Sequence, residues 1–297
     1  MTAAGLTVDR HESAEGFWEM TRRPAHPSLA AYVRHYVGWR ERTRLPLRRR
    51  EVPMAGIHMI ISFGPATHLL DPADPSAPSR RHVSFVPGLH DALSLIETDG
   101  EGYGLEAELT PLGARRILGI PMHELSNRVT DLEDLLGGRA AALLTERLYE
   151  AAGWPERFDL LEAVFAGRVA EGPAPRPDVE WAWRRLEQTD GAVPVGTLAG
   201  ELGCSRRHLT VRFREEVGLP PKALARVLRF QRAIAILRED GAHGSDGGER
   251  APWAQVAHAC GYYDQPHLNR EFRAFAGLSP GEFAARLLPG GGGISGD

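Results

Sequence analysis

The feature that most constrains this chain is an internal repeat in its C-terminal third. The segment LAGELG at 198–203 and the segment VAHACG at 256–261 both place an alanine four residues before a glycine. A His-Leu pair, a phenylalanine and a Gly-Leu pair follow each glycine, and the second copy has one extra residue in its turn. Such a repeat predicts two copies of one small structural unit.

Each copy is typical of a short helix, a glycine turn and a second helix. In the second copy, Asp264 can cap the second helix, and Pro266 is tolerated in its first turn because the missing N–H would have no partner there. Leu268, Phe272 and Phe275 recur at i, i+4 and i+7, which predicts one buried stripe. The positions off the stripe are hydrogen-bonding and mostly basic, so each copy is a helix-turn-helix candidate.

Charge is distributed unevenly along the chain. The 42% hydrophobic and 25% charged residues are ordinary for a soluble globular protein, and the formal net charge is −4. Residues 193–238 contain nine basic and three acidic residues, a net charge of +6 against −10 for the remainder. This asymmetry suggests a nucleic-acid-binding face. Lys222 is the single lysine, and we attribute the dominance of arginine to coding bias.

The two cysteines and the hydropathy indicate in which cellular compartment the protein works. Cys204 and Cys260 show neither CxxC nor His spacing, so they predict no disulfide framework and no zinc site. Cys260 stands where Leu202 stands in the first copy, which predicts a small buried side chain. No apolar run reaches the ~20 residues of a membrane span, and the N-terminus lacks the apolar region of a signal peptide. The sequence predicts a cytoplasmic, nucleoid-associated protein that does not bind membranes.

The predicted fold class is α+β, with a β-rich, barrel-like N-terminal domain that also contains helices, followed by an all-α domain with two helix-turn-helix units. Short β-branched or alternating runs such as 57–61 and 102–110 predict strands. We expect 29–37 to form a short helix that leads into a strand. Further helices are expected at 111–118, 131–136, 139–152, 155–169, 178–188 and 221–239, with a flexible insertion at 241–250. The predicted domains are a flexible N-terminus (1–20), a β-rich sensory or dimerisation domain (21–170), a Pro-rich linker (171–177), a DNA-binding domain (178–288) and a disordered tail (289–297).

The C-terminal third, from about 179 to 287, resembles the DNA-binding domain of the AraC/XylS family of transcriptional regulators. The resemblance implies seven helices, with two recognition helices that enter successive major grooves about 34 Å, or 10 bp, apart on one face of the duplex. The residues that carry it are Leu198, Ala199, Gly203, Ser205, His208, Leu209, Phe213, Arg229, Ala233, Leu237, Gly261, Tyr262, Asp264, Gln265, Pro266, His267, Phe272, Gly277, Leu278, Ser279 and Pro280.

The resemblance also assigns the residues that would contact DNA. Arginine can donate to guanine O6 and N7, Asn and Gln can pair with adenine, and methyl groups can contact thymine. Cations near the helix flanks suit phosphates better. Two features depart from the pattern: Pro266 occupies a slot where a base-reading residue could sit, and the 241–250 insertion lengthens the connection between the units. The implied base-reading positions are Arg206, Arg207, Thr210, Val211, Gln265, Asn269 and Arg270, and the implied phosphate contacts are Arg214, His267 and Arg273.

The N-terminal 170 residues resemble the β-rich sensory or dimerisation domain of many family members. The segments PMAGIH (53–58) and LTPLGAR (109–115) recur in a poorly characterised subgroup. In arabinose-type members this domain binds a small effector inside a barrel, but no residue here shows what would bind. His58, His68, His82 and His90 lack the His-x-His spacing of a metal site, and we interpret them as core or surface residues. No metal or cofactor is predicted.

The sequence therefore predicts a sequence-specific transcription regulator and not an enzyme. Its expected partners are double-stranded DNA, a small-molecule effector, RNA polymerase for an activator, and a second copy of the chain. The leucines of 139–169 could support that homodimer, although packing within the domain explains them equally well.

Two other classes of protein, a fused enzyme and a protein-binding adaptor, fit the sequence less well. A fused DNA-repair alkyl transferase would need a nucleophilic cysteine in a Pro-Cys-His-type site, and both cysteines lie in the wrong domain, while a fused cupin-like enzyme lacks its metal signature. A protein-binding adaptor would need an acidic or apolar recognition face instead of an Arg-rich one.

Overall fold

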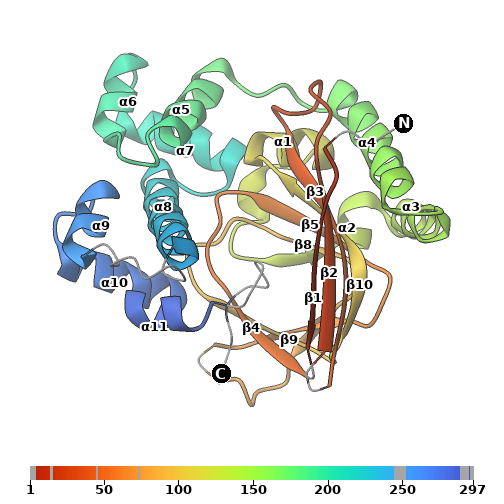
Figure 1. The fold of residues 1–297 in the computed structure, drawn as a ribbon. Helices are drawn as coiled ribbons and strands as arrows, with labels where there is room; N and C mark the ends of the chain where they lie inside the picture. Colours follow the sequence, from red (N-terminus) through yellow and green to blue (C-terminus); the bar gives the residue numbers. More distant parts are fainter. Residues whose placement is uncertain are drawn as a thin grey trace.

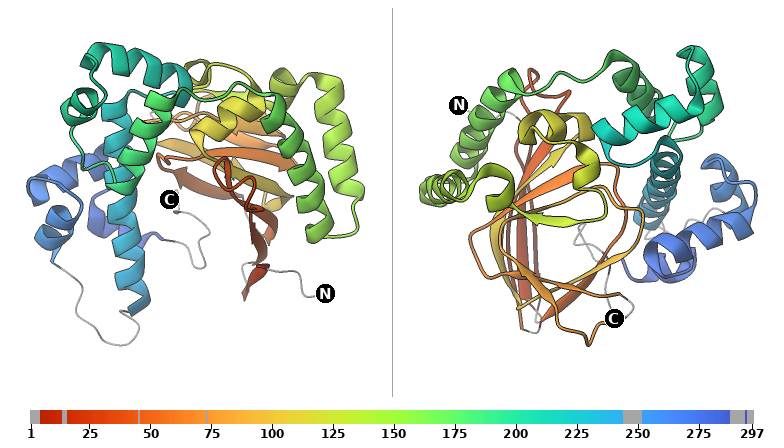
Figure 2. Two further views of the ribbon diagram at one scale, coloured as in Figure 1. Left: turned by 90° about the horizontal axis from the view of Figure 1, so that it is seen from above. Right: turned by 180° about the vertical axis from the view of Figure 1, so that it is seen from behind.

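A computed structural model describes residues 5–13, 16–44, 46–72, 74–243, 252–287 and Ile294. A β-rich N-terminal part lies beside an all-helical C-terminal part (Figures 1 and 2), which confirms the predicted fold class. The predicted insertion at 241–250 lies outside the described residues except for 241–243, which end a long helix. Of the predicted disordered tail, only Ile294 is described.

The β-rich part contains two sheets in which all paired strands are antiparallel. The larger has the order β1-β2-β3-β10-β5-β8-β11, and the smaller has the order β4-β9-β6-β7. The strands are β1 (Thr7–Ser13), β2 (Gly16–Pro24), β3 (Val33–Thr43), β4 (Leu47–Glu51), β5 (Ile57–Ser62), β6 (Thr67–Leu70), β7 (Arg80–His82), β8 (Phe85–Pro87), β9 (Ser94–Thr98), β10 (Glu101–Leu109) and β11 (Val129–Asp131).

One face of the larger sheet is buried beneath helices. In β5 the side chains of Ile57, Met59 and Ile61 are buried and alternate with half-buried ones, as period two requires. Tyr36 of β3 stacks on two phenylalanines of α4 (Trp154–Glu171), with ring centroids 5.8 Å from Phe158 and 6.3 Å from Phe165. Helices α3 and α4 therefore lie on the side of this sheet opposite the C-terminal part (Figure 1).

Short helices connect the sheet to this layer. Helix α1 (Pro111–Leu118) begins where the Thr110 hydroxyl accepts from the Gly113 N–H at 3.0 Å. It ends at Gly119, whose φ of +75° is the left-handed conformation that glycine tolerates. The chain then forms a 3₁₀ turn (Met122–Glu124), α2 (Leu132–Leu136) and α3 (Gly138–Glu150).

A buried arginine holds the end of α3. The Arg157 Nε donates to Leu148 O at 2.8 Å, and its Nη2 donates to Tyr149 O and Ala151 O at 3.2 Å. Its guanidinium also lies over the Trp154 ring at 4.8 Å. The cation satisfies carbonyls that the helix end leaves unpaired, which stabilises the α3–α4 turn.

The helical part is built around α8 (Pro221–His243). Phe230 of α8 packs edge-on against Phe272 and Phe275, with ring centroids 4.8 and 5.1 Å apart. Arg226 pairs with the buried Glu271 at 2.9 Å. The remaining helices are α5 (Pro177–Gln188), α6 (Val195–Glu201), α7 (Arg206–Val217), α9 (Trp253–Ala259), α10 (Gln265–Ala276) and α11 (Pro280–Ala285).

The two parts are packed against each other. The Gln231 Oε1 of α8 accepts from the Ala55 N–H at 3.3 Å. The linker is also fixed to α7, because the Arg176 N–H and guanidinium both contact the buried Glu216, at 2.9 and 3.2 Å. At the end of α7, a Cβ on Gly218 would lie 2.8 Å from the Ser126 Oγ. The first helix-turn-helix unit is therefore in direct contact with the β-rich part.

The structure corrects the expected flexible N-terminus of 1–20. Residues 7–13 and 16–24 form β1 and β2, while residues 1–4 lie outside the described chain. Ion pairs between the strands, Asp9 with Arg22 and Arg10 with Glu19, explain how a polar segment forms a strand. An edge strand can be polar on both faces, so hydropathy alone did not indicate it.

The expected helix at 29–37 was also wrong, and the one described residue of the expected disordered tail has a place in the fold. Residues 27–32 form turns and Val33–Thr43 form β3, where a helix was expected at 29–37. Pairing with β10 buries Val33 and Tyr36 and outweighs the local helical spacing. In the tail, Ile294 is buried, bridges to Leu287 and accepts from the Arg50 N–H at 2.9 Å.

Among the described helices, none is both long and apolar enough to cross a membrane.

Candidate nucleic-acid interface

The two repeated units have the same backbone design. Each begins with a seven-residue helix, α6 or α9, and continues into a twelve-residue helix, α7 or α10. At the end of the first helix, the Leu202 N–H donates to Leu198 O at 3.1 Å, and the Cys260 N–H donates to Val256 O at the same distance. The repeat that the sequence predicts is thus present in the backbone hydrogen bonds.

The turns between the helices also match. Gly203 and Gly261 have φ values of +61° and +72°, which glycine adopts at little cost. Directly after them, the Cys204 N–H donates to Ala199 O at 3.0 Å, and the Tyr262 N–H donates to Ala257 O at 2.9 Å. The Ala-x-x-x-Gly spacing of the sequence therefore encodes the turn.

The second helix of each unit begins with a side-chain cap. Ser205 Oγ accepts from the His208 N–H at 3.2 Å, and Asp264 Oδ1 accepts from the His267 N–H at 2.8 Å. The expected cap at Asp264 and the expected proline in the first turn of α10 are both confirmed. Buried stripes hold the two helices: Leu209 and Phe213 in α7, and Leu268, Phe272 and Phe275 in α10.

Helix α7 brings together the residues predicted to contact DNA in the first unit. Arg206, Arg207, Val211 and Arg214 are exposed, and Val211 keeps 61% of its surface. The half-buried Thr210 donates its hydroxyl to Arg206 O at 2.8 Å. Its hydrogen-bonding capacity is partly used within the helix, which leaves the methyl group for external contact. A Cβ on Gly196 would lie 2.5 Å from Arg206 Nη2, so this guanidinium lies against α6.

Helix α10 carries the second set. Arg270 and Arg273 are exposed, while Gln265, His267 and Asn269 are half-buried. The His267 ring packs edge-on against the buried Tyr262, with ring centroids 5.2 Å apart. This contact limits how far the imidazole can reach outward.

Sequence reasoning missed Tyr263. It lies in the turn between α9 and α10 and keeps 93% of its surface exposed. An aromatic side chain with this exposure, adjacent to a helix-turn-helix turn, presents an apolar ring and a polar hydroxyl to an external partner. The signal was the second aromatic of the GYYD segment, since the first, Tyr262, is the buried one.

Some arginines of the helical part pair with carboxylates of neighbouring helices, whereas others point outward and form no ion pair in the described chain. Arg212 pairs with Asp178 at 2.6 Å and Arg226 pairs with Glu271 at 2.9 Å, which fixes α7 to α5 and α8 to α10. In the described ranges no ion pair involves the outward-facing cations, namely Arg206, Arg207, Arg214, Arg270 and Arg273. The charges of Arg206, Arg207, Arg214 and Arg270 are therefore available to an external anion, while the charge of Arg273 also acts on Glu282 and helps to lower the pKa of that carboxyl.

Neither cysteine is in a disulfide, and burial raises the pKa of the Cys260 thiol to about 11. A thiol with so high a pKa is mostly protonated at neutral pH and is a poor nucleophile. The expected small buried side chain at Cys260 is confirmed, with 3% of its surface exposed.

The four histidines weighed as metal ligands, His58, His68, His82 and His90, lie with separate partners. His58 Nδ1 is 2.5 Å from Glu106 Oε1, and His82 Nδ1 is 2.8 Å from Asp131 Oδ1. His68 contacts the Ser79 hydroxyl, and His90 contacts the Gly88 carbonyl. Within the described chain, no three or more His, Cys, Asp or Glu side chains gather as a metal site.

The pair formed by His58 of β5 and Glu106 of β10 joins neighbouring strands of the larger sheet. Burial alone would lower the pKa of His58, but the charge of Glu106 and the hydrogen bond to it raise that pKa to about 9. In Glu106, burial is outweighed by His58, and its pKa is lowered. The pair is therefore ionic at neutral pH.

Comparison with known proteins supports the two-part organisation. Residues 198–286 match the family described as "Helix-turn-helix domain", and residues 21–131 match a domain of unknown function, DUF6597. An AraC-like transcription regulator of Streptomyces antibioticus is 32% identical over 95 residues, which are 32% of this chain and 28% of that protein. The segment 198–286 is thus a helix-turn-helix domain, and the resemblance stated for it is confirmed.

The solved structures that this chain matches are distant. ToxT from Vibrio cholerae O395 is 13% identical, with a TM-score of 0.43 over 81% of this chain and 96% of that one. ToxT with a bound unsaturated fatty acid is 12% identical, with a TM-score of 0.45 over 93% and 97% of the two chains. The C-terminal domain of AraT from Geobacillus stearothermophilus is 19% identical, with a TM-score of 0.33 over 38% and 88%.

Proposed function

We propose that this chain is a sequence-specific transcription regulator whose α7 and α10 bind successive major grooves of double-stranded DNA. The observation that carries the proposal is the repeated unit, matched in turn, cap and hydrogen bonds, with outward arginines that form no ion pair within the described residues. Backbone phosphates provide most of the affinity for such a basic surface. A buried, protonated Cys260 gives no support to a transferase activity, and we propose a binding function without catalysis.

Roles follow from position on the two helices. We assign base reading to Arg206, Arg207, Thr210 and Val211 of α7 and to Gln265, Asn269 and Arg270 of α10, and phosphate contact to Arg214, His267 and Arg273. Among these, Arg207 is the strongest candidate for guanine because Arg206 already lies against Gly196. We add Tyr263 as a contact in the second unit.

The β-rich part would sense a small effector or dimerise, and it would pass that state to α7 through their direct contact. An activator of this kind would also contact RNA polymerase. We place the protein in the cytoplasm, associated with the nucleoid, and propose the boundary between the parts at residues 171–177.

The proposal is tested by finding the operator through genomic footprinting and then measuring affinity by fluorescence anisotropy over a range of salt. Each phosphate that a cation neutralises adds about −0.9 to the slope of log K against log salt. Arg214→Gln should reduce the slope by about one on every sequence, and Arg42→Gln, a well-exposed arginine of β3, should not. Binding that does not vary with salt would contradict the proposal.

A further inference from the structure

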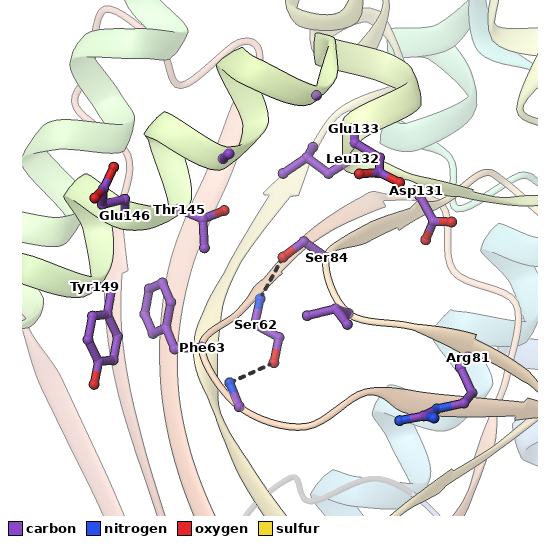
Figure 3. A pocket seen from close by; sticks show the side chains of 14 residues that line it. Ser62, Phe63, Arg81, Ser84, Asp131, Leu132, Glu133, Thr145, Glu146 and Tyr149 are labelled. Carbon is purple, nitrogen blue, oxygen red and sulfur yellow. Dashed lines mark hydrogen bonds between the residues drawn. The ribbon is translucent and has the colours of Figure 1, made fainter.

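A cleft of about 870 Å³ lies at the edge of the β-rich part, away from the helix-turn-helix units. It is bounded by the end of β5, the segment before β8, the end of β11 and the helices α2 and α3 (Figure 3). Small-molecule sites in proteins have volumes of roughly 300–1,000 Å³. The cleft therefore has room for an organic ligand.

One wall of the cleft is aromatic and apolar. Phe63 and Tyr149 meet edge to face with ring centroids 5.9 Å apart, and Figure 3 shows them side by side. Val83 contributes a further apolar side chain, and 49% of its surface is exposed, against 58% for Tyr149. Large apolar side chains with this exposure favour a partner that covers them.

The other walls are polar and mostly acidic. Three carboxylates line the cleft, from Asp131, Glu133 and Glu146, against the single guanidinium of Arg81. Figure 3 shows Asp131 and Glu133 across the cleft from the aromatic wall, with Glu146 on the helix above that wall. When all four groups are ionised, their net charge is −2.

The aromatic wall is held in place from behind. The buried Arg157 ties the carbonyls that end α3 to α4, and its guanidinium lies 5.4 Å from the centre of the Phe63 ring. On the polar side, the Ser62 N–H donates to the Ser84 Oγ at 3.1 Å. These contacts fix the walls before a ligand arrives, and a fixed site loses less conformational entropy on binding.

We propose that this cleft binds an organic cation with an aromatic or apolar body. The aromatic faces would attract the cation and cover its body, while Glu133 and Glu146 would neutralise its charge. Asp131 is already engaged by His82, 2.8 Å away, and adds to the acidic character of the wall. An anion of the same shape would meet three carboxylates and one arginine, and is expected to be excluded.

The position of the cleft also suggests what binding does, and this step rests on the function proposed above. Asp131 and Leu132 line the cleft, and the chain just before them, Met122–Ser126, contacts Gly218 at the end of α7. The bound cation would therefore act on the first recognition helix through a connection of a few residues.

The test uses two dyes with the same ring system and opposite charge, the cation rhodamine 123 and the anion fluorescein. Binding to the full-length protein without DNA is measured by fluorescence anisotropy. Rhodamine 123 should bind and fluorescein should not. Glu133→Gln should weaken rhodamine binding about 2–5-fold, and the double variant with Glu146→Gln about tenfold, as expected for partly exposed charge pairs. Arg81→Gln should strengthen it.

Glu150→Gln provides the matched control, because Glu150 is exposed on α3, as Glu146 is, but does not line the cleft. Equal affinity for both dyes, or equal effects of Glu133→Gln and Glu150→Gln, would overturn the proposed site. Rhodamine 123 should then change the affinity for the operator in the wild type but not in the double variant. Dye binding that leaves operator affinity unchanged would overturn the connection to α7, and a protein that binds the dye but no DNA would contradict the proposed function instead.

Discussion

At the scale of single residues, direction decides what an arginine does. Arg226 and Arg157 face the interior and have partners, Glu271 and three carbonyls respectively, while Arg207 and Arg270 on the outward faces of α7 and α10 form no ion pair in the described chain. Burying an unpaired guanidinium is costly, so a cation left without an internal partner marks a surface that can bind an anion.

Replacing Arg207 with Ala should weaken binding to the operator by about 1–3 kcal/mol and relax the preference at one base pair. The measurement is anisotropy with the operator and with each single-base variant of it. An equal loss on every sequence would show that Arg207 contacts only phosphate.

The ion pair of His58 and Glu106 should make stability depend on pH. The folded pKa of His58, about 9, is above the ordinary value of 6.5, so its contribution is complete below pH 6.5 and is lost as the pH rises through 9. The lowered pKa of Glu106 gives a contribution that is present above pH 4.5 and is lost as the pH falls through the folded pKa.

A double-mutant cycle with His58→Gln and Glu106→Gln isolates this pair from its neighbours. Urea unfolding should give a coupling energy of about 1–3 kcal/mol at pH 7 and much less at pH 10, because the imidazole is then neutral. A coupling energy that is the same at both pH values would rule out the ionic pair.

Arg157→Met should lower the free energy of unfolding by about 2–4 kcal/mol, because it leaves three helix-end carbonyls without their donor and removes a stacked cation. Arg157→Lys should cost less, since it keeps the charge but not the planar fork. Urea unfolding of both variants checks the order, and equal costs would show that the positive charge contributes nothing without the planar fork.

At the scale of elements, the helix-turn-helix units were predictable and the N-terminal strands were not. Glycine, cap and apolar stripe each act within a few residues, so Gly261, Asp264 and Phe272 could be placed from spacing alone. In contrast, β1 is a strand through its antiparallel pairing with β2 over Thr7–Ser13, where Asp9 and Arg10 also find ion-pair partners. Arg157 likewise depends on carbonyls and rings from other elements, which no local pattern reveals.

Two glycines near the first turn should respond oppositely to alanine. Gly203 has a φ of +61°, so Gly203→Ala should destabilise the protein by about 1–2 kcal/mol. Gly200 lies within α6 with no atom within 4 Å of an added Cβ, so Gly200→Ala should stabilise it by about 0.5 kcal/mol. Thermal unfolding measures both, and two shifts of the same sign would contradict this description of the turn.

At the scale of the whole molecule, the sequence predicted two parts and their fold class but not how they meet. The contact between Gly218 and Ser126, and that between Gln231 and Ala55, join residues far apart in the chain. Such contacts depend on the shapes of both surfaces, and no spacing within either part encodes them. The cleft beside α3 escaped prediction for the same reason, since its lining comes from several strands and helices.

Removal of residues 1–176 should leave a fragment that binds the operator but no longer responds to rhodamine 123. The fragment keeps both recognition helices and the Phe230 cluster that holds the second unit. It loses the contacts at Gly218 and Gln231, so its unfolding midpoint should be lower. Circular dichroism and anisotropy at low salt check this, and a helical fragment that fails to bind would place the true boundary elsewhere.

The near-absence of lysine has a practical consequence. Lys222, exposed in the first turn of α8, carries the single side-chain amine of the chain. Acetylation in the cell, or a succinimidyl fluorophore in the laboratory, therefore has a single side-chain amine to modify, and it lies on the helix that joins the two units. The arginines that we assign to the duplex remain untouched by such reagents, so a dye placed there can report on docking without altering it.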